Sequence, residues 1–161
     1  MASSEKNLSD TKLNQRFDIS KFGFGLVVAE WNEQVTEALY LGAYQTLINV
    51  GANQEKIERI NVPGTFELSL GAQWMAEHHD MDAVICIGCV IQGETRHFDF
   101  ICKAVADGIT NVSLKFNKPV TFGVLTPDNM KQALDRAGGK YGNKGIEAAT
   151  AAIKMLEIKS N

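Results

Sequence analysis

Four short apolar runs alternate with longer segments that carry apolar residues at steps of three and four, and this alternation constrains the fold more than any other feature. The runs predict strands at residues 24–29, 57–62, 83–91 and 120–125. Strands separated by helices form parallel sheets that are covered on both faces. We therefore predict an α/β fold, a three-layer sandwich with a doubly wound, four-stranded parallel sheet and helices on both faces.

Local residues predict where the helices begin and end. Asn32 is suited to the N-cap of the first helix and Gly51 to its end. Thr126-Pro127 favours the start of the fourth helix, which is expected to end near Gly138. The last helix is predicted from about residue 143 to residue 156.

Length and composition limit the class of protein. A chain of 161 residues, 45% hydrophobic, has the size of one domain. We expect a flexible polar arm at residues 1–15 and a single folded domain at residues 16–161. The apolar runs fall short of the roughly 20 residues of a membrane span, and the N-terminus lacks an apolar signal core. Three cysteines, an odd number, do not make a disulfide framework, so a cytoplasmic location is expected.

The charge balance bears on partners. Sixteen basic and nineteen acidic residues give a formal charge of −3, and no basic block occurs. Nucleic-acid binding needs a concentrated cationic face. Neither nucleic acid nor membrane is therefore an expected partner.

Unusual residues follow three of the predicted strands, at positions 30–32, 62–67 and 88–97. In parallel α/β sheets, ligands bind beyond the carboxyl ends of the strands. These loops bring an indole ring, a carboxylate, a hydroxyl and an imidazole to one edge of the sheet. Gly93-Glu94-Thr95 precedes a helix, where free backbone N–H groups bind anions. The sequence predicts a site for a phosphorylated small molecule.

The same residues have structural interpretations that remain open at this point. Trp31 could cap the core, and a carboxylate at Glu67 suits the first turn of a helix. A histidine at position 97 could be a structural group. Residues 136–145 (RAGGKYGNKG) predict a flexible, positive loop, although Arg and Lys also suit the solvated end of a helix.

The spacing of Cys86 and Cys89 invites a metal or redox interpretation, with Cys102 and His97 as further ligands. Side chains three positions apart on a strand point to opposite faces of the sheet, so both thiols cannot easily reach one ion. We predict that the cysteines pack in the core and that there is no metal site.

Four segments together resemble lumazine synthase, the penultimate enzyme of riboflavin biosynthesis. They are residues 62–67 (VPGTFE), 88–99 (GCVIQGETRHFD), 122–126 (FGVLT) and 136–147 (RAGGKYGNKGIE). The resemblance extends from about residue 22 to residue 156, which makes residues 16–161 a single catalytic domain.

The resemblance implies a flavodoxin-like fold in subunits that form pentamers, in some cases assembled into a 60-subunit icosahedral capsid, and riboflavin synthase as a partner. It implies a transferase that condenses 5-amino-6-(D-ribitylamino)uracil with 3,4-dihydroxy-2-butanone 4-phosphate. The products are 6,7-dimethyl-8-ribityllumazine, phosphate and water. These steps are proton transfers, so no cofactor is expected.

The resemblance also assigns roles to individual residues. His97 would transfer protons. The pyrimidine and its ribityl chain would be bound by Trp31, Asn32, Thr65, Phe66, Glu67, Cys89, Val90, Ile91 and Phe122. The phosphate would be bound by Glu94, Thr95 and Arg136, and Lys144 is a weaker candidate for contact with the substrates. Phe122 and Arg136 would come from the adjacent subunit.

Two positions depart from the family pattern. Trp31 stands where phenylalanine is frequent, which enlarges the stacking face, and Gln92 replaces a common arginine. A flavodoxin-like electron carrier remains an alternative, but it would need a hydroxyl-rich phosphate loop where this chain has residues 30–32. A purely structural shell protein is a third hypothesis, which would not need His97 beside an anion-binding turn.

Overall fold

A four-stranded parallel sheet with the order β2-β1-β3-β4 forms the centre of the computed structural model, which describes residues 17–161. The strands are β1 (Phe24–Ala29), β2 (Ile57–Val62), β3 (Ala83–Cys89) and β4 (Val120–Leu125). Every residue of β1 and β3 is buried, as their near-continuous apolar sequences require of central strands. The predicted sheet is confirmed, whereas the predicted arm at residues 1–15 lies outside the described residues.

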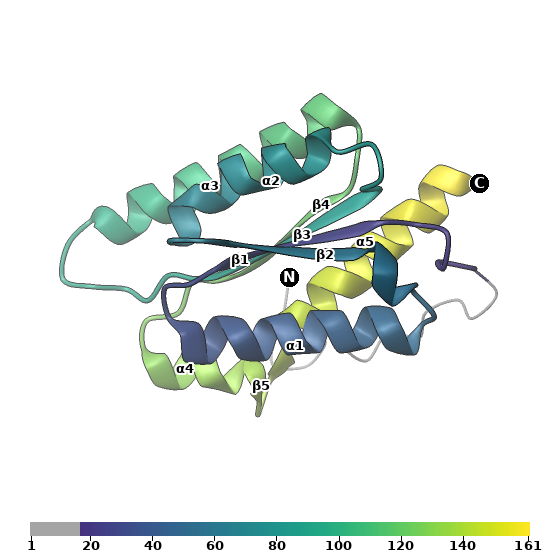
Figure 1. Cartoon of the computed structure of the whole chain (residues 1–161). Coiled ribbons are helices and arrows are strands. Elements are labelled where there is room, and N and C mark those ends of the chain that lie inside the picture. Colours follow the sequence, from purple (N-terminus) through teal and green to yellow (C-terminus); the bar gives the residue numbers. More distant parts are fainter. Residues whose placement is uncertain (1–16) are drawn as a thin grey trace.

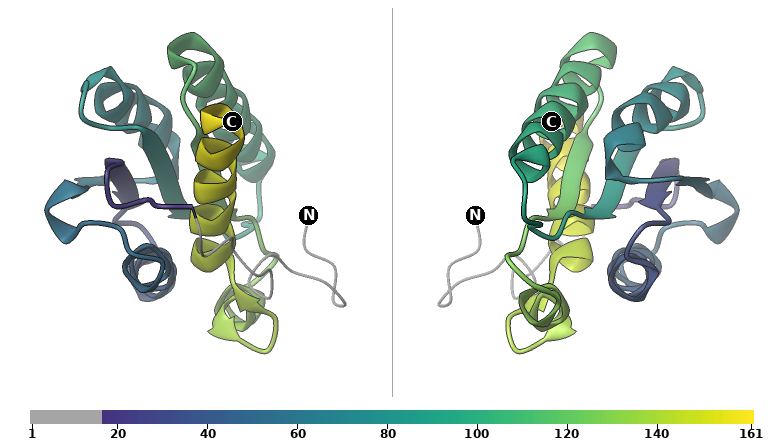
Figure 2. Two further views of the ribbon diagram at one scale, coloured as in Figure 1. Left: turned by 90° about the vertical axis from the view of Figure 1, so that its right-hand side faces the viewer. Right: turned by 90° about the vertical axis from the view of Figure 1, so that its left-hand side faces the viewer.

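Helices cover both faces of this sheet. α1 (Glu33–Asn49) and α5 (Lys144–Ser160) pack on one face, and α2 (Leu68–Glu77) and α3 (His97–Phe116) pack on the other (Figure 1). Figure 2 shows α1 and α2 on opposite sides of the strands. Two hydrophobic core clusters lie between these layers, so the predicted three-layer sandwich is confirmed.

The third strand is shorter than predicted, because it ends at Cys89 rather than at residue 91. Beyond that point the backbone is bound by the last residue of β4 and by the segment that follows it. Val90 N–H donates to the carbonyl of Leu125 at 2.8 Å, and Gln92 N–H donates to that of Pro127 at 2.9 Å. After Cys89 the chain thus leaves the β3–β4 ladder, but these two hydrogen bonds keep it attached to the chain at the end of β4.

The predicted fourth helix is present, but it begins later and ends earlier than predicted. α4 spans only Met130–Asp135, and its N-cap is Asn129, whose side chain accepts a hydrogen bond from Gln132 N–H. Thr126-Pro127 does not open a helix, since the Pro127 carbonyl is used by the loop after β3. Asn129, whose side chain suits an N-cap, and Met130, a good helix former, gave the stronger signal for the start of this helix.

The glycine-rich stretch after α4 is an ordered hairpin rather than the flexible loop that was predicted. β5 (Ala137–Gly139) pairs with β6 (Gly142–Asn143) around the two-residue turn Lys140-Tyr141. Gly138 and Gly142 have φ values of 108° and 80°, a backbone region that glycine adopts without strain. The hairpin lies beside α1 (Figure 1).

The last helix begins where predicted but extends to Ser160. Asn143 is its N-cap: the side-chain oxygen accepts from Gly145 N–H at 2.8 Å and from Ile146 N–H at 3.3 Å. Its amide nitrogen donates to the Ala38 carbonyl in α1 at 2.9 Å. One buried side chain therefore connects the start of α5 to α1.

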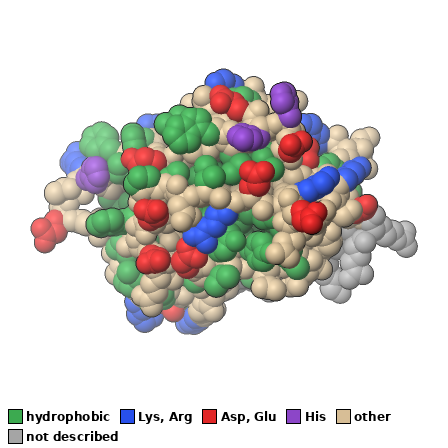
Figure 3. All heavy atoms as spheres, in the orientation of Figure 1, with side chains coloured by type: hydrophobic (Ala, Val, Ile, Leu, Met, Phe, Trp, Pro, Cys, Tyr) green, Lys and Arg blue, Asp and Glu red, His purple; other side chains and the backbone are tan. Residues whose placement is uncertain are grey.

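The surface carries several large apolar side chains among its charged groups (Figure 3). Exposed examples are Leu41, Leu70, Trp74, Phe100, Leu114, Met155 and Ile158. They lie on α1, α2, α3 and α5, so apolar surface remains open on both helical layers. None of the described helices is long and apolar enough to span a membrane.

Candidate active site

A cavity of about 360 Å³ lies where β1, β2 and β3 end, at the carboxyl edge of the sheet. We call it the strand-end cavity. Its lining residues are Trp31, Asn32, Gly64, Thr65, Phe66, Glu67, Cys89, Val90, Ile91, His97 and Ile101. All of them except Gly64 and Ile101 belong to the site predicted from the sequence. Residues separated by up to 70 positions thus meet in one hollow because parallel strands end at the same edge.

Ile101 was missed as a lining residue, because it fitted the apolar stripe by which α3 packs on the sheet. It lies one turn after His97, and residues four apart share a helix face. The four-residue spacing from His97 to Ile101 is the sequence feature that could have predicted this lining residue. Gly64 precedes the short 3₁₀ helix η3 (Thr65–Glu67) and carried no comparable signal.

One backbone oxygen holds two of the loops around the cavity. The carbonyl of Cys89 accepts a hydrogen bond from Asn32 Nδ2 at 2.9 Å and another from Thr65 Oγ1 at 3.4 Å. Gly88 makes room for the second contact, because a Cβ at that position would lie 2.9 Å from Leu68 Cδ1 and 3.0 Å from Thr65. The loops after β1 and β2 are therefore fastened to the end of β3.

Asn32 is the N-cap residue of α1 by position, as predicted, but its side chain makes no cap hydrogen bond. Its backbone is left-handed, with φ 63°, a conformation that asparagine tolerates better than most residues. This turn directs the amide away from the helix and toward Cys89. The sequence could not indicate this, since the acceptor lies 57 positions away.

Two aromatic side chains form open walls of the cavity. Trp31 is 72% exposed and Phe66 is 55% exposed. The backbone of Trp31 is fixed, since its N–H donates to the Pro63 carbonyl at 3.2 Å. An exposed indole on an ordered backbone does not cap the core; it offers a flat apolar face to a ring in the cavity.

Glu67 and His97 supply the titratable groups of the cavity, and both are exposed. His97 is the first residue of α3, and its backbone N–H donates to Thr95 Oγ1 at 3.3 Å. The predicted anion-binding turn, Gly93-Glu94-Thr95, precedes Arg96, the N-cap residue of this helix. It is exposed, and neither Glu94 nor Thr95 lines the strand-end cavity.

The three cysteine thiols have raised pKa values and are therefore poor nucleophiles near neutral pH. Cys86 packs in the core cluster beneath α2 and α3, and Cys89 in the cluster beneath α1 and α5, as their spacing predicted. Burial raises the pKa of both thiols to about 12. The pKa of Cys102 is raised as well, first by burial and then by Asp99. Within residues 17–161, no cluster of His, Cys, Asp or Glu could hold a metal ion.

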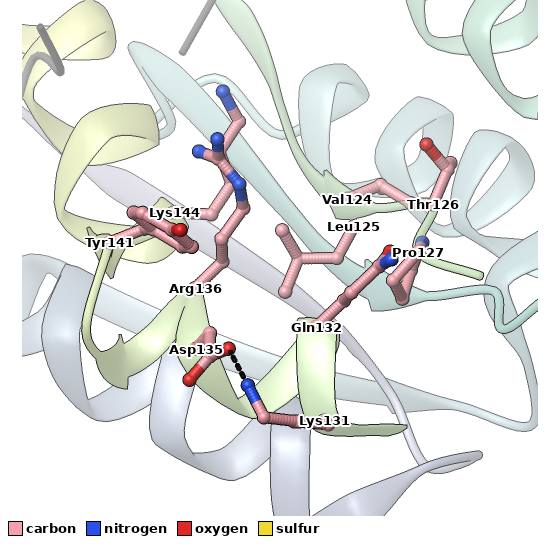
Figure 4. Close-up of a pocket in the computed structure, with 10 residues that line it drawn as sticks. All are labelled: Val124, Leu125, Thr126, Pro127, Lys131, Gln132, Asp135, Arg136, Tyr141 and Lys144. Carbon is pink, nitrogen blue, oxygen red and sulfur yellow. Dashed lines mark hydrogen bonds and ion pairs between the residues drawn. The ribbon is translucent and has the colours of Figure 1, made fainter. Parts of the chain in front are cut away.

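A second cavity, of about 570 Å³, lies beyond the end of β4 and is bounded by α4 and the hairpin (Figure 4). We call it the hairpin cavity. Its lining residues are Val124, Leu125, Thr126, Pro127, Lys131, Gln132, Asp135, Arg136, Tyr141 and Lys144.

Two predicted site residues, Arg136 and Lys144, thus lie in the hairpin cavity and not in the strand-end cavity. Their side chains extend toward the same end of it, while the Lys131–Asp135 ion pair occupies the other end (Figure 4). Lys144 Nζ also lies 3.1 Å from Glu147 Oε2, a carboxylate that is only 2% exposed. Phe122, on the edge strand β4, lines neither cavity and is 36% exposed. The chain therefore brings nine of the predicted site residues together in the strand-end cavity and keeps five apart from it: Glu94, Thr95, Phe122, Arg136 and Lys144.

Comparison with known proteins identifies relatives over nearly the whole chain. Residues 21–160 match the family model described as 6,7-dimethyl-8-ribityllumazine synthase. Proteins of that name share 64% identity in Cytophaga hutchinsonii, over 97% of this chain and 98% of the relative, and 52% in Flavobacterium johnsoniae, over 99% and 84%. A relative of the same name in Parabacteroides distasonis is 49% identical over 99% of this chain and its own full length. The chain belongs to the 6,7-dimethyl-8-ribityllumazine synthase family.

Proposed function

We propose that the chain condenses 5-amino-6-(D-ribitylamino)uracil with 3,4-dihydroxy-2-butanone 4-phosphate to give 6,7-dimethyl-8-ribityllumazine, a step of riboflavin biosynthesis. The observation that carries this proposal is the strand-end cavity, which unites an exposed indole, a carboxylate and an imidazole in one hollow. Family membership supports the same reaction.

Each wall of the cavity suits one part of the pyrimidine substrate. Trp31 would stack on the ring, while Asn32, the loop 65–67 and the end of β3 at residues 89–91 would hold the ring and its ribityl chain. The Asn32 amide and the Thr65 hydroxyl already donate to Cys89, so they would act chiefly by fixing the walls. Glu67 remains a carboxylate acceptor for substrate N–H or O–H groups.

The phosphate of the second substrate would bind at the start of α3. The backbone N–H groups of Gly93-Glu94-Thr95 precede a helix of 20 residues, whose N-terminus favours negative charge. The side chain of Glu94 is itself anionic, so its contribution would come from the backbone. His97 lies next to this turn and in the cavity, between the two proposed substrate subsites.

His97 would move the protons that the reaction requires. The amine of the pyrimidine attacks the ketone carbon and water is lost, giving an imine. Removal of the neighbouring C–H proton forms an enol, from which phosphate leaves as the C–O bond breaks. After tautomerisation the second amine attacks the new ketone, a second water leaves, and the ring closes. An imidazole accepts and donates protons near neutral pH, and fixing two reactants together supplies much of the remaining rate.

Arg136, Phe122 and Lys144 would complete this site from a neighbouring subunit. They lie outside the strand-end cavity of their own chain, whereas a cyclic oligomer brings such a surface against the next chain. The exposed apolar side chains on α1, α2, α3 and α5 suit subunit contacts. We propose a pentamer, with a 60-subunit shell as a further level of assembly.

The proposal extends to the domain organisation, location and partner of the enzyme, and family membership supports it. We propose a cytoplasmic enzyme whose residues 16–161 form a single catalytic domain, with riboflavin synthase as a partner. The proposed steps are proton transfers and eliminations, which the chain's own side chains can support without a cofactor.

The direct test of function is incubation of the purified chain with both substrates while the fluorescence of the lumazine product is followed. Product formation that depends on both substrates supports the proposal. A folded protein that forms no product would refute it.

The position of the pyrimidine can be tested separately with the two tryptophans. Trp31 lines the cavity, whereas Trp74 lies on α2 and lines a different surface. A pyrimidine analogue should quench fluorescence in the Trp74→Phe protein but not in the Trp31→Phe protein. Quenching that persists without Trp31 would place the ring elsewhere.

A further inference from the structure

Tyr141 occupies an unusual place in the hairpin cavity. It stands at the tip of the two-residue turn between β5 and β6, yet it is half-buried and lines the cavity. Its backbone N–H donates to the carbonyl of Asp135 at 2.7 Å, which folds the tip back onto the end of α4. Side chains at hairpin tips usually point into solvent. The ring of Tyr141 instead lies against the cavity because the backbone hydrogen bond to Asp135 holds the tip there.

The backbone of Arg136 is fixed from both sides. Its N–H donates to Ala133 at 3.1 Å, and its carbonyl accepts from Lys144 N–H at 3.0 Å. The side chain, in contrast, contains four rotatable bonds, so a fixed backbone does not by itself place the guanidinium.

The ring of Tyr141 lies beside that side chain. The guanidinium carbon of Arg136 is 5.7 Å from the ring centroid, within the range of a cation–π contact. Figure 4 shows the ring next to Arg136, on the side away from Val124 and Leu125. Lys140 also contacts the ring, with Nζ 5.0 Å from the centroid, but it does not line the cavity.

We propose that Tyr141 is a positioning residue for Arg136: its ring face restricts the guanidinium so that it is presented toward the phosphate of the four-carbon substrate. This inference rests on the proposed function of Arg136 as a phosphate ligand. A guanidinium binds phosphate well when its fork is held in one orientation, because less side-chain entropy is then lost on binding.

The test compares Tyr141→Leu, which removes the ring, with Tyr141→Phe, which retains it. Tyr141→Leu should raise the KM for 3,4-dihydroxy-2-butanone 4-phosphate about three- to tenfold, as expected for loss of a partly exposed cation–π contact. The KM for the pyrimidine and kcat should be unchanged, and Tyr141→Phe should behave as the wild type. An equal rise in both KM values, or a Phe variant as impaired as the Leu variant, would overturn the proposal.

A double-mutant cycle shows whether the ring acts through Arg136. In an Arg136→Ala background, Tyr141→Leu should cause no further rise in the KM for the phosphate substrate. If Tyr141→Leu raised this KM by the same factor in the wild-type and the Arg136→Ala proteins, the proposal would be overturned. If Arg136→Ala leaves that KM unchanged while product still forms, the phosphate role of Arg136 fails together with this inference, but the overall reaction stands.

A matched control exists elsewhere in the chain. The guanidinium carbon of Arg59 lies 4.1 Å from the ring centroid of Tyr40, a contact of the same kind outside both cavities. Tyr40→Leu should leave both KM values at the wild-type level. A rise in the KM for the phosphate substrate in this control would show that loss of any such contact has that effect, and would overturn a specific role for Tyr141.

Discussion

Mixed assembly of two defective chains gives a quantitative test of the shared site. His97 lies in the strand-end cavity and Arg136 in the hairpin cavity of the same chain. If each active site takes His97 from one chain and Arg136 from the next, His97→Ala and Arg136→Ala chains can complement each other. The two variants are unfolded together, in equal amounts, and then reassembled.

The expected recovery follows from counting the chains at each interface. Half of the chains carry an intact His97, and half of the neighbours carry an intact Arg136. Independent mixing therefore restores both groups at about one site in four. If instead both residues acted within one chain, every site would lack one of them and no activity would return.

The assay follows lumazine fluorescence with the four-carbon substrate kept below its wild-type KM. Under this condition the Arg136→Ala protein alone should be nearly inactive. Native mass spectrometry verifies that mixed oligomers have formed. The same variants mixed after separate refolding serve as the control and should stay inactive. Recovery near zero in verified mixed oligomers would refute the shared site.

Three further predictions concern catalysis, stability and thiol reactivity. His97→Ala should lower turnover by about 10²- to 10⁴-fold with an unchanged circular dichroism spectrum, and a folded variant with wild-type turnover would contradict the role of His97. Asn143→Ala removes the α5 cap and leaves the Ala38 carbonyl without that donor. The free energy of unfolding, measured in urea at matched protein concentration, should therefore fall by about 2–4 kcal/mol. A fall of less than about 1 kcal/mol would be evidence against this role of Asn143. Because the pKa of Cys86 and Cys89 is about 12, only about one in ten thousand of these thiols is ionised at pH 8. A thiol reagent should therefore modify Cys102 alone in the native protein and all three cysteines in urea. Rapid native labelling of Cys86 would show that its burial had been misjudged.

The sheet was predictable from the sequence because burial on both faces leaves a strong local signal. This signal is complete in β1, whose six residues are all buried. The edge strands β2 (IERINV) and β4 (VTFGVL) also have the predicted bounds, although they carry polar and partly exposed residues. The strand-end cavity was predictable for a related reason. Once the strands are parallel, the residues after each strand must meet at one edge.

The parts that were not predictable depend on partners far away in the sequence. The Asn32 amide binds a carbonyl 57 positions away, and the Pro127 carbonyl is claimed by the loop after β3. The hairpin after α4 depends on positive φ at Gly138 and Gly142, whereas a run of glycines and cations indicates flexibility when it is considered alone. In the first two cases a tertiary contact decided between local conformations, and in the hairpin the positive φ values of two glycines did so.

The tethering of two loops to the Cys89 carbonyl affects how this site can change during evolution. The acceptor belongs to the main chain, so no amino-acid replacement at position 89 can remove it. The side chain at that position is buried in the core cluster beneath α1 and α5, while the residue also lines the cavity. A replacement at position 89 therefore changes the packing of this core cluster at the edge of the site, while the main-chain acceptor that fastens both loops remains.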